Sequence, residues 1–193
     1  MVLTESEDDL ERGDEAPDFE LPGTDGETYT LDSFADDEAL LVVFTCNHCP
    51  YAKAKMPLLN DLAAEYDDVA VVGINPNDAV EYPEDSFEAM QEWVGDGRVA
   101  YDAYLRDESQ SVAQAYGAVC TPDPFLFRRE DEGAGDGAGA TWTLAYHGRL
   151  DDAPNPDDEP ERLVIREAID AVLAGEEVTV EEVPSRGCSI KWT

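Results

Sequence analysis

Continuous apolar segments alternate along the chain with segments in which apolar residues recur every three to four positions. The runs Ala39–Phe44 and Val69–Ile74 predict strands that are buried on both faces. Phe125–Phe127 and Trp142–Tyr146 predict two further strands, and Thr28–Leu31 alternates as a short strand does. The sequence therefore predicts a sheet with a central, fully covered portion.

Helical spacing of apolar residues predicts four helices between and after these strands. Three of them are followed by a glycine, Gly95, Gly117 or Gly175, as is common at helix ends. The predicted helices are 50–66, 85–94, 110–116 and 161–174. Residues 130–140 are expected to form a flexible hairpin insert between the last two strands. This order of elements predicts an α/β sandwich around a mixed central sheet.

Length and charge limit the interpretation further. With 193 residues, of which 42% are hydrophobic, the chain is long enough for one domain with a proper core. We expect that domain to span 12–193, after a solvated and partly disordered acidic arm at 1–11. The net charge of −34 makes nucleic acid and anionic membrane surfaces improbable partners.

The acidic residues are spread through every segment, and the chain has only three lysines, Lys53, Lys55 and Lys191. This composition is typical of proteins from extreme halophiles, which work in molar salt where the Debye length is about 3 Å. The N-terminus lacks the basic and apolar regions of a secretion signal, and no run approaches the roughly 20 apolar residues of a membrane span. We therefore expect a cytoplasmic protein.

The most informative motif is Cys46-Asn47-His48-Cys49-Pro50, which follows the first buried strand and begins the first helix. Two cysteines three residues apart can share one disulfide, and the onset of a helix favours a thiolate. A Cys-x-x-Cys pair in a strand-to-helix setting predicts redox chemistry, and the same spacing in a loop would suit half a zinc site.

This motif, the order of elements and Cys120-Thr121-Pro122 together resemble the thioredoxin superfamily. The segment 16–21, the Cys49-Pro50 step and the hairpin insert resemble its peroxiredoxin (AhpC/TSA-related) branch. The chain is most similar to peroxiredoxin-like, thioredoxin-fold proteins with Cys-Asn-His-Cys-Pro-Tyr and a terminal Gly-Cys-Ser-Ile-Lys-Trp, here residues 46–51 and 187–192. The resemblance covers roughly residues 12 to 193 and implies a thioredoxin-like fold.

The resemblance also implies roles for individual residues. Cys46 is the expected exposed nucleophile and Cys49 the resolving thiol, with Pro50 in the first helical turn. Pro122 matches the cis-proline that faces the redox pair, and Thr121 precedes it. Peroxiredoxins carry Thr where Cys46 stands, a departure that favours disulfide exchange over peroxide reduction at Cys49.

The remaining candidates are less constrained by the sequence. His48 would stabilise a thiolate and raise the redox potential above that of ordinary thioredoxin, about −270 mV. Cys120 and Cys188 are each an additional resolving thiol or a small buried hydrophobe. His147 is expected to be a turn residue. The arginines that could support a thiolate, among which the sequence does not choose, are Arg98, Arg106 and Arg128.

Several functions remain open at this point. The leading one is a thiol–disulfide oxidoreductase that cycles the pair Cys46–Cys49 without a cofactor or metal, acting on protein or small-molecule disulfides with an unidentified reductant. The second is a thiol peroxidase that acts on peroxides at Cys49, with Cys46 or Cys188 resolving. A third is Cu or Zn handling by Cys46, His48, Cys49 and a distant His or Cys. The fourth is an inert scaffold whose cysteines have no reactive role. Whichever function applies, a homodimer is a further expectation.

Overall fold

The computed structural model describes residues 2–7, 9–130 and 140–193. The predicted insert at 130–140 therefore lies mostly outside the described residues. The elements are β1 Leu3–Glu5, β2 Leu21–Pro22, β3 Thr28–Tyr29, β4 Ala39–Phe44, α1 Pro50–Glu65, β5 Val69–Asn75, α2 Phe87–Gly95, β6 Ala103–Arg106, α3 Ser111–Tyr116, β7 Cys120–Thr121, β8 Asp123–Glu130, β9 Thr141–His147, α4 Val164–Leu173 and β10 Arg186–Ser189.

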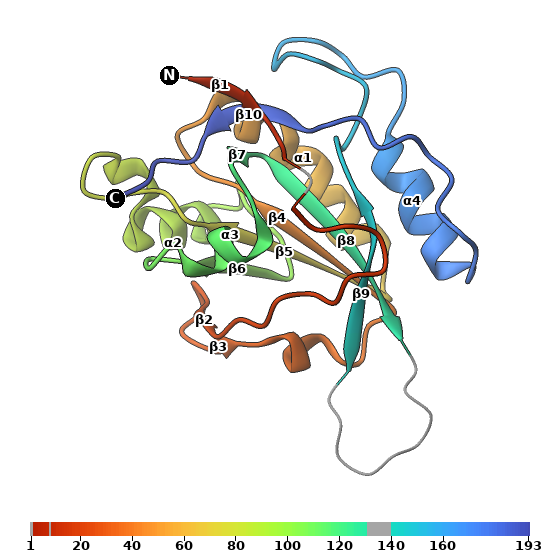
Figure 1. Cartoon of the computed structure of the whole chain (residues 1–193). Coiled ribbons are helices and arrows are strands. Elements are labelled where there is room, and N and C mark those ends of the chain that lie inside the picture. Colours follow the sequence, from red (N-terminus) through yellow and green to blue (C-terminus); the bar gives the residue numbers. More distant parts are fainter. Residues whose placement is uncertain (1, 8, 131–139) are drawn as a thin grey trace.

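The central sheet has five strands in the order β6-β5-β4-β8-β9 (Figure 1). Strand β4 pairs in parallel with β5, and β5 pairs in parallel with β6. On its other side β4 pairs antiparallel with β8, and β8 pairs antiparallel with β9. This is the mixed sheet that the alternation of elements predicts, and the fold is the expected thioredoxin-like α/β sandwich.

Both faces of the central strand are buried, which explains its continuous apolar run. Ala39, Leu41 and Val43 pack with residues of α1 and α4 on one face. Leu40, Val42 and Phe44 pack on the other face with residues of α3 and of the segments that precede β4. Because side chains alternate along a strand, six consecutive apolar residues supply both layers of the core.

A second sheet has the order β1-β10-β7, and this arrangement corrects the expectation for the N-terminus. Residues 1–11 were predicted to be a partly disordered arm, but Leu3–Glu5 pairs antiparallel with Arg186–Ser189. Ser6 continues the contact, since its amide donates to the carbonyl of Ser185 at 2.9 Å. In Figure 1 the two ends of the chain run together along the same side of the molecule.

The helices match the predicted ones with shifted boundaries. Helix α3 ends at Gly117, which adopts the left-handed conformation expected of a C-terminal glycine (φ 68°). The predicted helix at 85–94 begins only at Phe87, because Pro83–Asp85 forms a separate 3₁₀ turn and Ser86 caps the helix by accepting from the amide of Ala89. Among the described helices, none is long and apolar enough to cross a bilayer.

The Thr121–Pro122 peptide bond is cis, as the resemblance predicted. Strand β10 passes beside it in close contact. A Cβ atom on Gly187 would lie 2.0 Å from the carbonyl oxygen of Thr121 and 3.1 Å from the nitrogen of Pro122. Glycine at position 187 is therefore what allows the C-terminal strand to approach the cis-proline turn.

Replacing Gly187 with alanine should destabilise the fold by about 1–3 kcal/mol, because backbone cannot move away from the new methyl group cheaply. Denaturant unfolding in molar KCl measures the change. Gly95→Ala is the matched control: its Cβ would meet no atom within 4 Å, so the same substitution there should be neutral or stabilise by about 0.5 kcal/mol. Equal midpoints for the two variants would contradict the close contact.

Candidate functional site

The candidate site lies where β4 ends and α1 begins. Cys49 is the N-cap residue of α1, with extended backbone (φ −75°, ψ 127°), and Pro50 occupies the first helical position. Proline is well tolerated there because its missing amide would have no partner within the helix. Cys46, Cys49 and Cys188 form one fully buried cluster with Ala52.

The disulfide in this cluster joins Cys49 to Cys188, whose Cα atoms are 6.3 Å apart. Cys188 lies in β10, 139 residues further along the chain, so the bond attaches the C-terminal strand to the start of α1. The sequence suggested a Cys46–Cys49 pair and gave Cys188 as a further resolving thiol. In this state of the protein Cys188 is the partner of Cys49, and Cys46 is a free thiol.

Cys46 is fully buried, which differs from the exposed position expected for it. Its Sγ lies 3.2 Å from the hydroxyl oxygen of Thr121. Burial and the nearby charge of Asp85 raise the pKa of Cys46 to about 12, against the opposing effects of Thr121 and two backbone amides. In this conformation Cys46 is therefore a protonated thiol.

Thr121 and Pro122 face the cysteines, as the resemblance implied. The carbonyl oxygen of Thr121 lies 3.5 Å from Cys49 Sγ, and the backbone of Thr121 pairs with Cys188 in the small sheet. Ser185 supports the turn by donating its hydroxyl to the carbonyl of Pro122 at 2.6 Å. The cis-proline turn thus contacts both halves of the disulfide and the free thiol.

Asp85 organises the loop of the motif, and the sequence analysis missed it. Its side chain is fully buried. One carboxylate oxygen accepts the backbone amides of Asn47 at 2.6 Å and His48 at 3.2 Å, and also the side-chain amide of Asn75 at 3.3 Å. The other oxygen accepts from Asn77 at 2.9 Å and bonds to His48. In the sequence Asp85 is one of 46 acidic residues, and nothing local distinguishes it.

His48 is held by this carboxylate. Its Nδ1 bonds to the second oxygen of Asp85, and its ring stacks on Tyr82 with centroids 4.7 Å apart. Burial disfavours the charged form of Asp85, but the bonds from His48, Asn77 and Asn47 prevail and lower the pKa of the carboxyl. Only 8% of the His48 side chain is exposed, and its Nε2 is buried with no hydrogen-bond partner among the described residues.

A chain of hydrogen bonds connects Asp85 to the C-terminal tail. Asn77, which donates to Asp85, accepts the backbone amide of Lys191 at 2.8 Å. The Lys191 carbonyl accepts from the amide of Asp78 and from the side chain of Gln110. Arg106 closes the network by donating to the carbonyls of Asn75 and Asn77. The tail that carries Cys188 is therefore attached to the same network as the loop of Cys46.

The other predicted residues lie outside the cluster. Cys120 is a buried free thiol whose pKa is raised by burial, and its Sγ lies 3.7 Å from the carbonyl of Pro122. The expectation of a turn at His147 was wrong: it ends β9, is buried, and bonds to Asp123 at 2.9 Å. Of the candidate arginines, Arg98 pairs with Asp96 on the surface and Arg128 donates to Glu176.

Cys46 Sγ, a ring nitrogen of His48 and an oxygen of Asp85, three groups that can ligate a metal ion, lie within 4.8 Å of one another. Both oxygens of Asp85 already accept hydrogen bonds, from five donors in total. This carboxylate therefore acts first as a support for the loop and for the imidazole.

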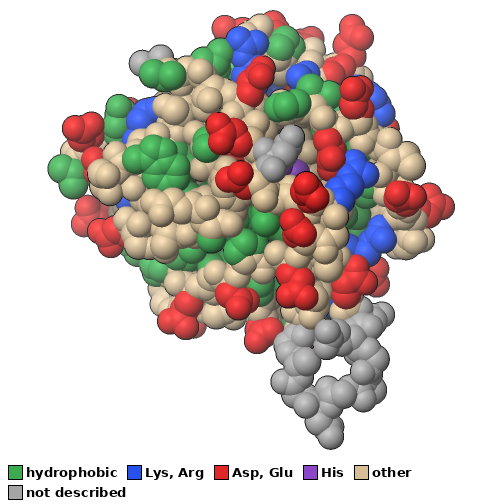
Figure 2. All heavy atoms as spheres, viewed as in Figure 1, with side chains coloured by type: hydrophobic (Ala, Val, Ile, Leu, Met, Phe, Trp, Pro, Cys, Tyr) green, Lys and Arg blue, Asp and Glu red, His purple; other side chains and the backbone are tan. Residues whose placement is uncertain are grey.

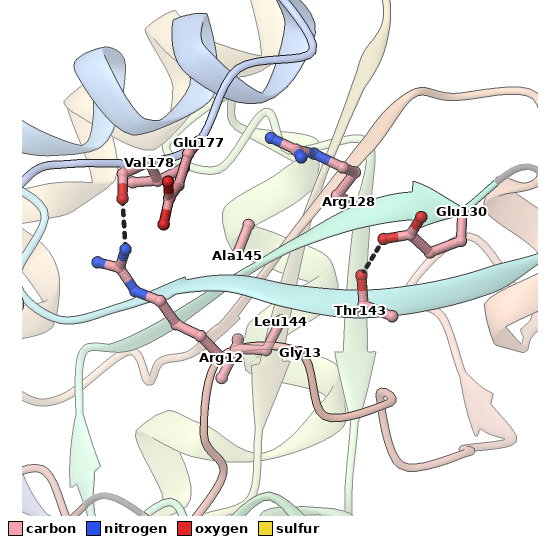
Figure 3. A pocket seen from close by; sticks show the side chains of 9 residues that line it. All are labelled: Arg12, Gly13, Arg128, Glu130, Thr143, Leu144, Ala145, Glu177 and Val178. Carbon is pink, nitrogen blue, oxygen red and sulfur yellow. Dashed lines mark hydrogen bonds between the residues drawn. The ribbon is translucent and has the colours of Figure 1, made fainter.

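The molecular surface shows acidic side chains scattered over the whole visible face, with hydrophobic groups between them (Figure 2). A pocket of about 310 Å³ lies beside β9 (Figure 3). Arg12 and Arg128 line this pocket, and Arg12 donates a hydrogen bond to the carbonyl of Val178. The lining contains none of the cysteines. We assign it no part in the thiol chemistry.

Comparison with known proteins identifies a family and several structures that resemble this chain. The model of the AhpC/TSA family matches residues 12–134. A search of curated proteins finds no match. The match to the family covers β4, the cysteine motif and the cis-proline turn, but not the tail with Cys188.

Solved structures extend the similarity over the whole chain. A hypothetical protein from Sinorhizobium meliloti 1021 is 42% identical, with 98% of each chain covered and a TM-score of 0.86. An uncharacterized conserved protein from Geobacillus kaustophilus is 40% identical, with 100% of this chain and 97% of that one covered and a TM-score of 0.87. The thioredoxin domain of a thiol-disulfide oxidoreductase from Bacteroides vulgatus is 19% identical over 72% of this chain and 91% of that one, with a TM-score of 0.51, and shares the fold.

Removing the Asp85 carboxylate should destabilise the protein by about 3–5 kcal/mol in Asp85→Ala, because several buried donors lose their acceptor. Asp85→Asn keeps one acceptor oxygen for the loop amides and should lose clearly less. Denaturant unfolding gives both values. Asp96→Ala, which breaks an exposed pair, is the control and should leave the midpoint unchanged; a similar loss there would contradict the role of Asp85.

Peptide mapping should find Cys49 and Cys188 linked in air-oxidised protein. Cys46 and Cys120 are buried, so a maleimide should label them slowly in the native protein and fully in denaturant. Mass spectrometry of the labelled peptides provides the measurement. A dominant Cys46–Cys49 peptide, with Cys188 labelled, would contradict the observed pairing.

Proposed function

The chain belongs to the AhpC/TSA family, and on that premise we propose that it is a thiol–disulfide oxidoreductase whose central sulfur is Cys49. The observation that carries the proposal is the Cys49–Cys188 disulfide at the start of α1, next to the free thiol of Cys46 and the cis-proline turn. Cys49 is thereby the one cysteine with two candidate partners, Cys46 by spacing and Cys188 by the observed bond.

The reaction transfers two electrons from the reduced protein to a substrate disulfide. A thiolate of the protein attacks one substrate sulfur, a mixed disulfide forms, and the other substrate sulfur leaves as a thiolate that takes up a proton. The second thiolate of the protein then attacks the mixed disulfide, forms the Cys49–Cys188 bond and releases the remaining substrate thiol. An external dithiol reverses these steps and restores the reduced protein.

Cys46 supplies an internal alternative to this bond. A Cys46 thiolate that attacks Cys49 would form Cys46–Cys49 and release Cys188 as a thiolate, with no net oxidation. Such an exchange would pass the disulfide between the motif and the tail. Cys46 is a free thiol in the same cluster as the disulfide, three positions before Cys49, which supports a role as this second partner.

A thiol peroxidase is the second candidate, favoured by the position of Cys49 at the N-cap with Pro50 behind it. Peroxide would oxidise the Cys49 thiolate to a sulfenic acid and leave as water. Condensation with the Cys188 thiol would then release a second water and form the same disulfide. Cys46 at the place of the peroxiredoxin Thr supports disulfide exchange as the first choice.

The protein is proposed to work in the cytoplasm and in molar salt. Protein or small-molecule disulfides are the substrates, and a cytoplasmic thiol system is the reductant. The charge of −34 supports function in molar salt, because self-repulsion is screened there. Assays therefore belong in molar KCl.

The test follows thiol loss after reduced protein receives one equivalent of a small-molecule disulfide, or separately of hydrogen peroxide. The same chain in denaturant provides the rate for unactivated thiols. We expect the folded protein to react with the disulfide at least about tenfold faster than this reference, and with peroxide no faster. Faster peroxide consumption that is lost in Cys49→Ser would establish the peroxidase instead.

Variants assign the sulfurs. Cys49→Ser should abolish the reaction, and Cys188→Ser should shift the product to Cys46–Cys49, as mass spectrometry of the peptides can show. Cys120→Ser is the matched control, because Cys120 is an equally buried cysteine outside the cluster, and it should react like wild type. An unchanged rate in Cys49→Ser would contradict the proposed centre.

A further inference from the structure

Reduction of the disulfide would leave three thiols in one enclosed space. Cys46, Cys49 and Cys188 are all fully buried and share a cluster with Ala52. Three ionised thiolates cannot share a buried space, because each lacks water and they repel one another. A bound cation removes this obstacle, since thiolate is the form that soft and borderline metals coordinate.

His48 offers a fourth donor that is already oriented. Its Nδ1 bonds to a carboxylate oxygen of Asp85, and the tautomer in which Nδ1 donates to that oxygen leaves a lone pair on Nε2. That Nε2 is buried, has no hydrogen-bond partner among the described residues, and belongs to a side chain that is 92% buried (8% exposed). Stacking on Tyr82 fixes the plane of the ring.

The arrangement of carboxylate, imidazole and open nitrogen is the one that supports metal-binding histidines in general. The carboxylate fixes the tautomer and raises the basicity of the ligating nitrogen. Here Asp85 is itself immobilised by Asn75, Asn77 and the loop amides, and a ring nitrogen of His48 lies within 4.8 Å of Cys46 Sγ. Asp85 would therefore support the site without entering the coordination sphere.

The tertiary structure also shows which residue from a distant part of the chain lies close enough to the motif to be a metal ligand. The sequence analysis considered a distant His or Cys as the fourth group. The chain has two histidines, so that His could only be His147, which is bonded to Asp123. Cys188 is instead the residue that reaches the motif. Three sulfurs and one nitrogen form a donor set that is typical of tetrahedral Zn²⁺.

We propose that the reduced protein binds one Zn²⁺ through the thiolates of Cys46, Cys49 and Cys188 and Nε2 of His48, with Asp85 as the positioning residue. Binding releases three protons, one from each thiol. Oxidation of Cys49 and Cys188 to their disulfide, by the substrate disulfide or peroxide considered above, gives two electrons to that oxidant and withdraws two ligands, so the ion is released. The inference rests on the proposed function in that Cys49–Cys188 must open and close.

Cobalt provides the probe, because thiolate-bound tetrahedral Co²⁺ absorbs in the visible and near ultraviolet whereas Zn²⁺ does not. Full-length protein is reduced with a phosphine, freed of it without oxygen, and titrated with Co²⁺ in molar KCl. We expect a sulfur-to-cobalt band that saturates at one ion per chain and disappears on addition of one equivalent of Zn²⁺. The oxidised protein has the same acidic surface and should give no band.

Variants separate the ligands from their support. Cys188→Ser and His48→Gln should weaken binding at least about tenfold, and Asp85→Asn about 10–100-fold, by loss of the supporting carboxylate. Cys120→Ser and His147→Gln are matched controls, and both should bind like wild type. Circular dichroism identifies any variant that does not fold.

A measurement on wild type alone makes the outcome independent of variant folding. Zn²⁺ should protect Cys46, Cys49 and Cys188 of the reduced protein from alkylation and leave the rate at Cys120 unchanged. Absence of the cobalt band in reduced protein, an equal band in oxidised protein, or equal alkylation with and without Zn²⁺ would overturn the proposal. Since the reduction is chemical, these results do not depend on whether the protein exchanges with substrate disulfides.

Discussion

The arrangement of the cysteines depends on one buried carboxylate. Asp85 accepts the two amides that follow Cys46 and bonds to the imidazole between the cysteines. A loop between a strand and a helix has backbone donors without partners in either element, and burial makes such donors costly. By satisfying them from a different part of the chain, Asp85 fixes where Cys46 and His48 lie relative to α1.

The C-terminal strand depends on the same network. Asn77 connects Asp85 to the backbone of Lys191, and Gly187 allows β10 to lie against the cis-proline turn. Cys188 thus reaches Cys49 on a strand that is paired on both sides. The reactive residues of the site are consequently divided between the motif and the tail. Whether the Cys49–Cys188 disulfide is closed or open decides whether the tail is covalently attached to the motif.

The proposed disulfide exchange and the proposed zinc binding would use the same atoms in different oxidation states. Oxidation joins two of the sulfurs in a disulfide, which is uncharged and can therefore be buried without a counter-ion. Reduction yields thiols whose ionisation is disfavoured by burial, as at Cys46. A buried group of thiols therefore favours either a disulfide or a bound cation. The surroundings of His48 are compatible with both.

Local sequence patterns specify the central layers of the fold and the position of the motif. Ala39–Phe44 and the helical spacing after Pro50 are local patterns that follow from burial on both faces of a strand and one face of a helix. The resemblance of Cys120-Thr121-Pro122 located the cis bond. Contacts between distant segments pair Cys188 with Cys49, make Leu3–Glu5 a strand and place Asp85 where it supports the loop. These contacts join residues far apart in the chain. A strand of two to four residues, or one aspartate among 46 acidic residues, carries no periodic signal, so no local pattern specifies them.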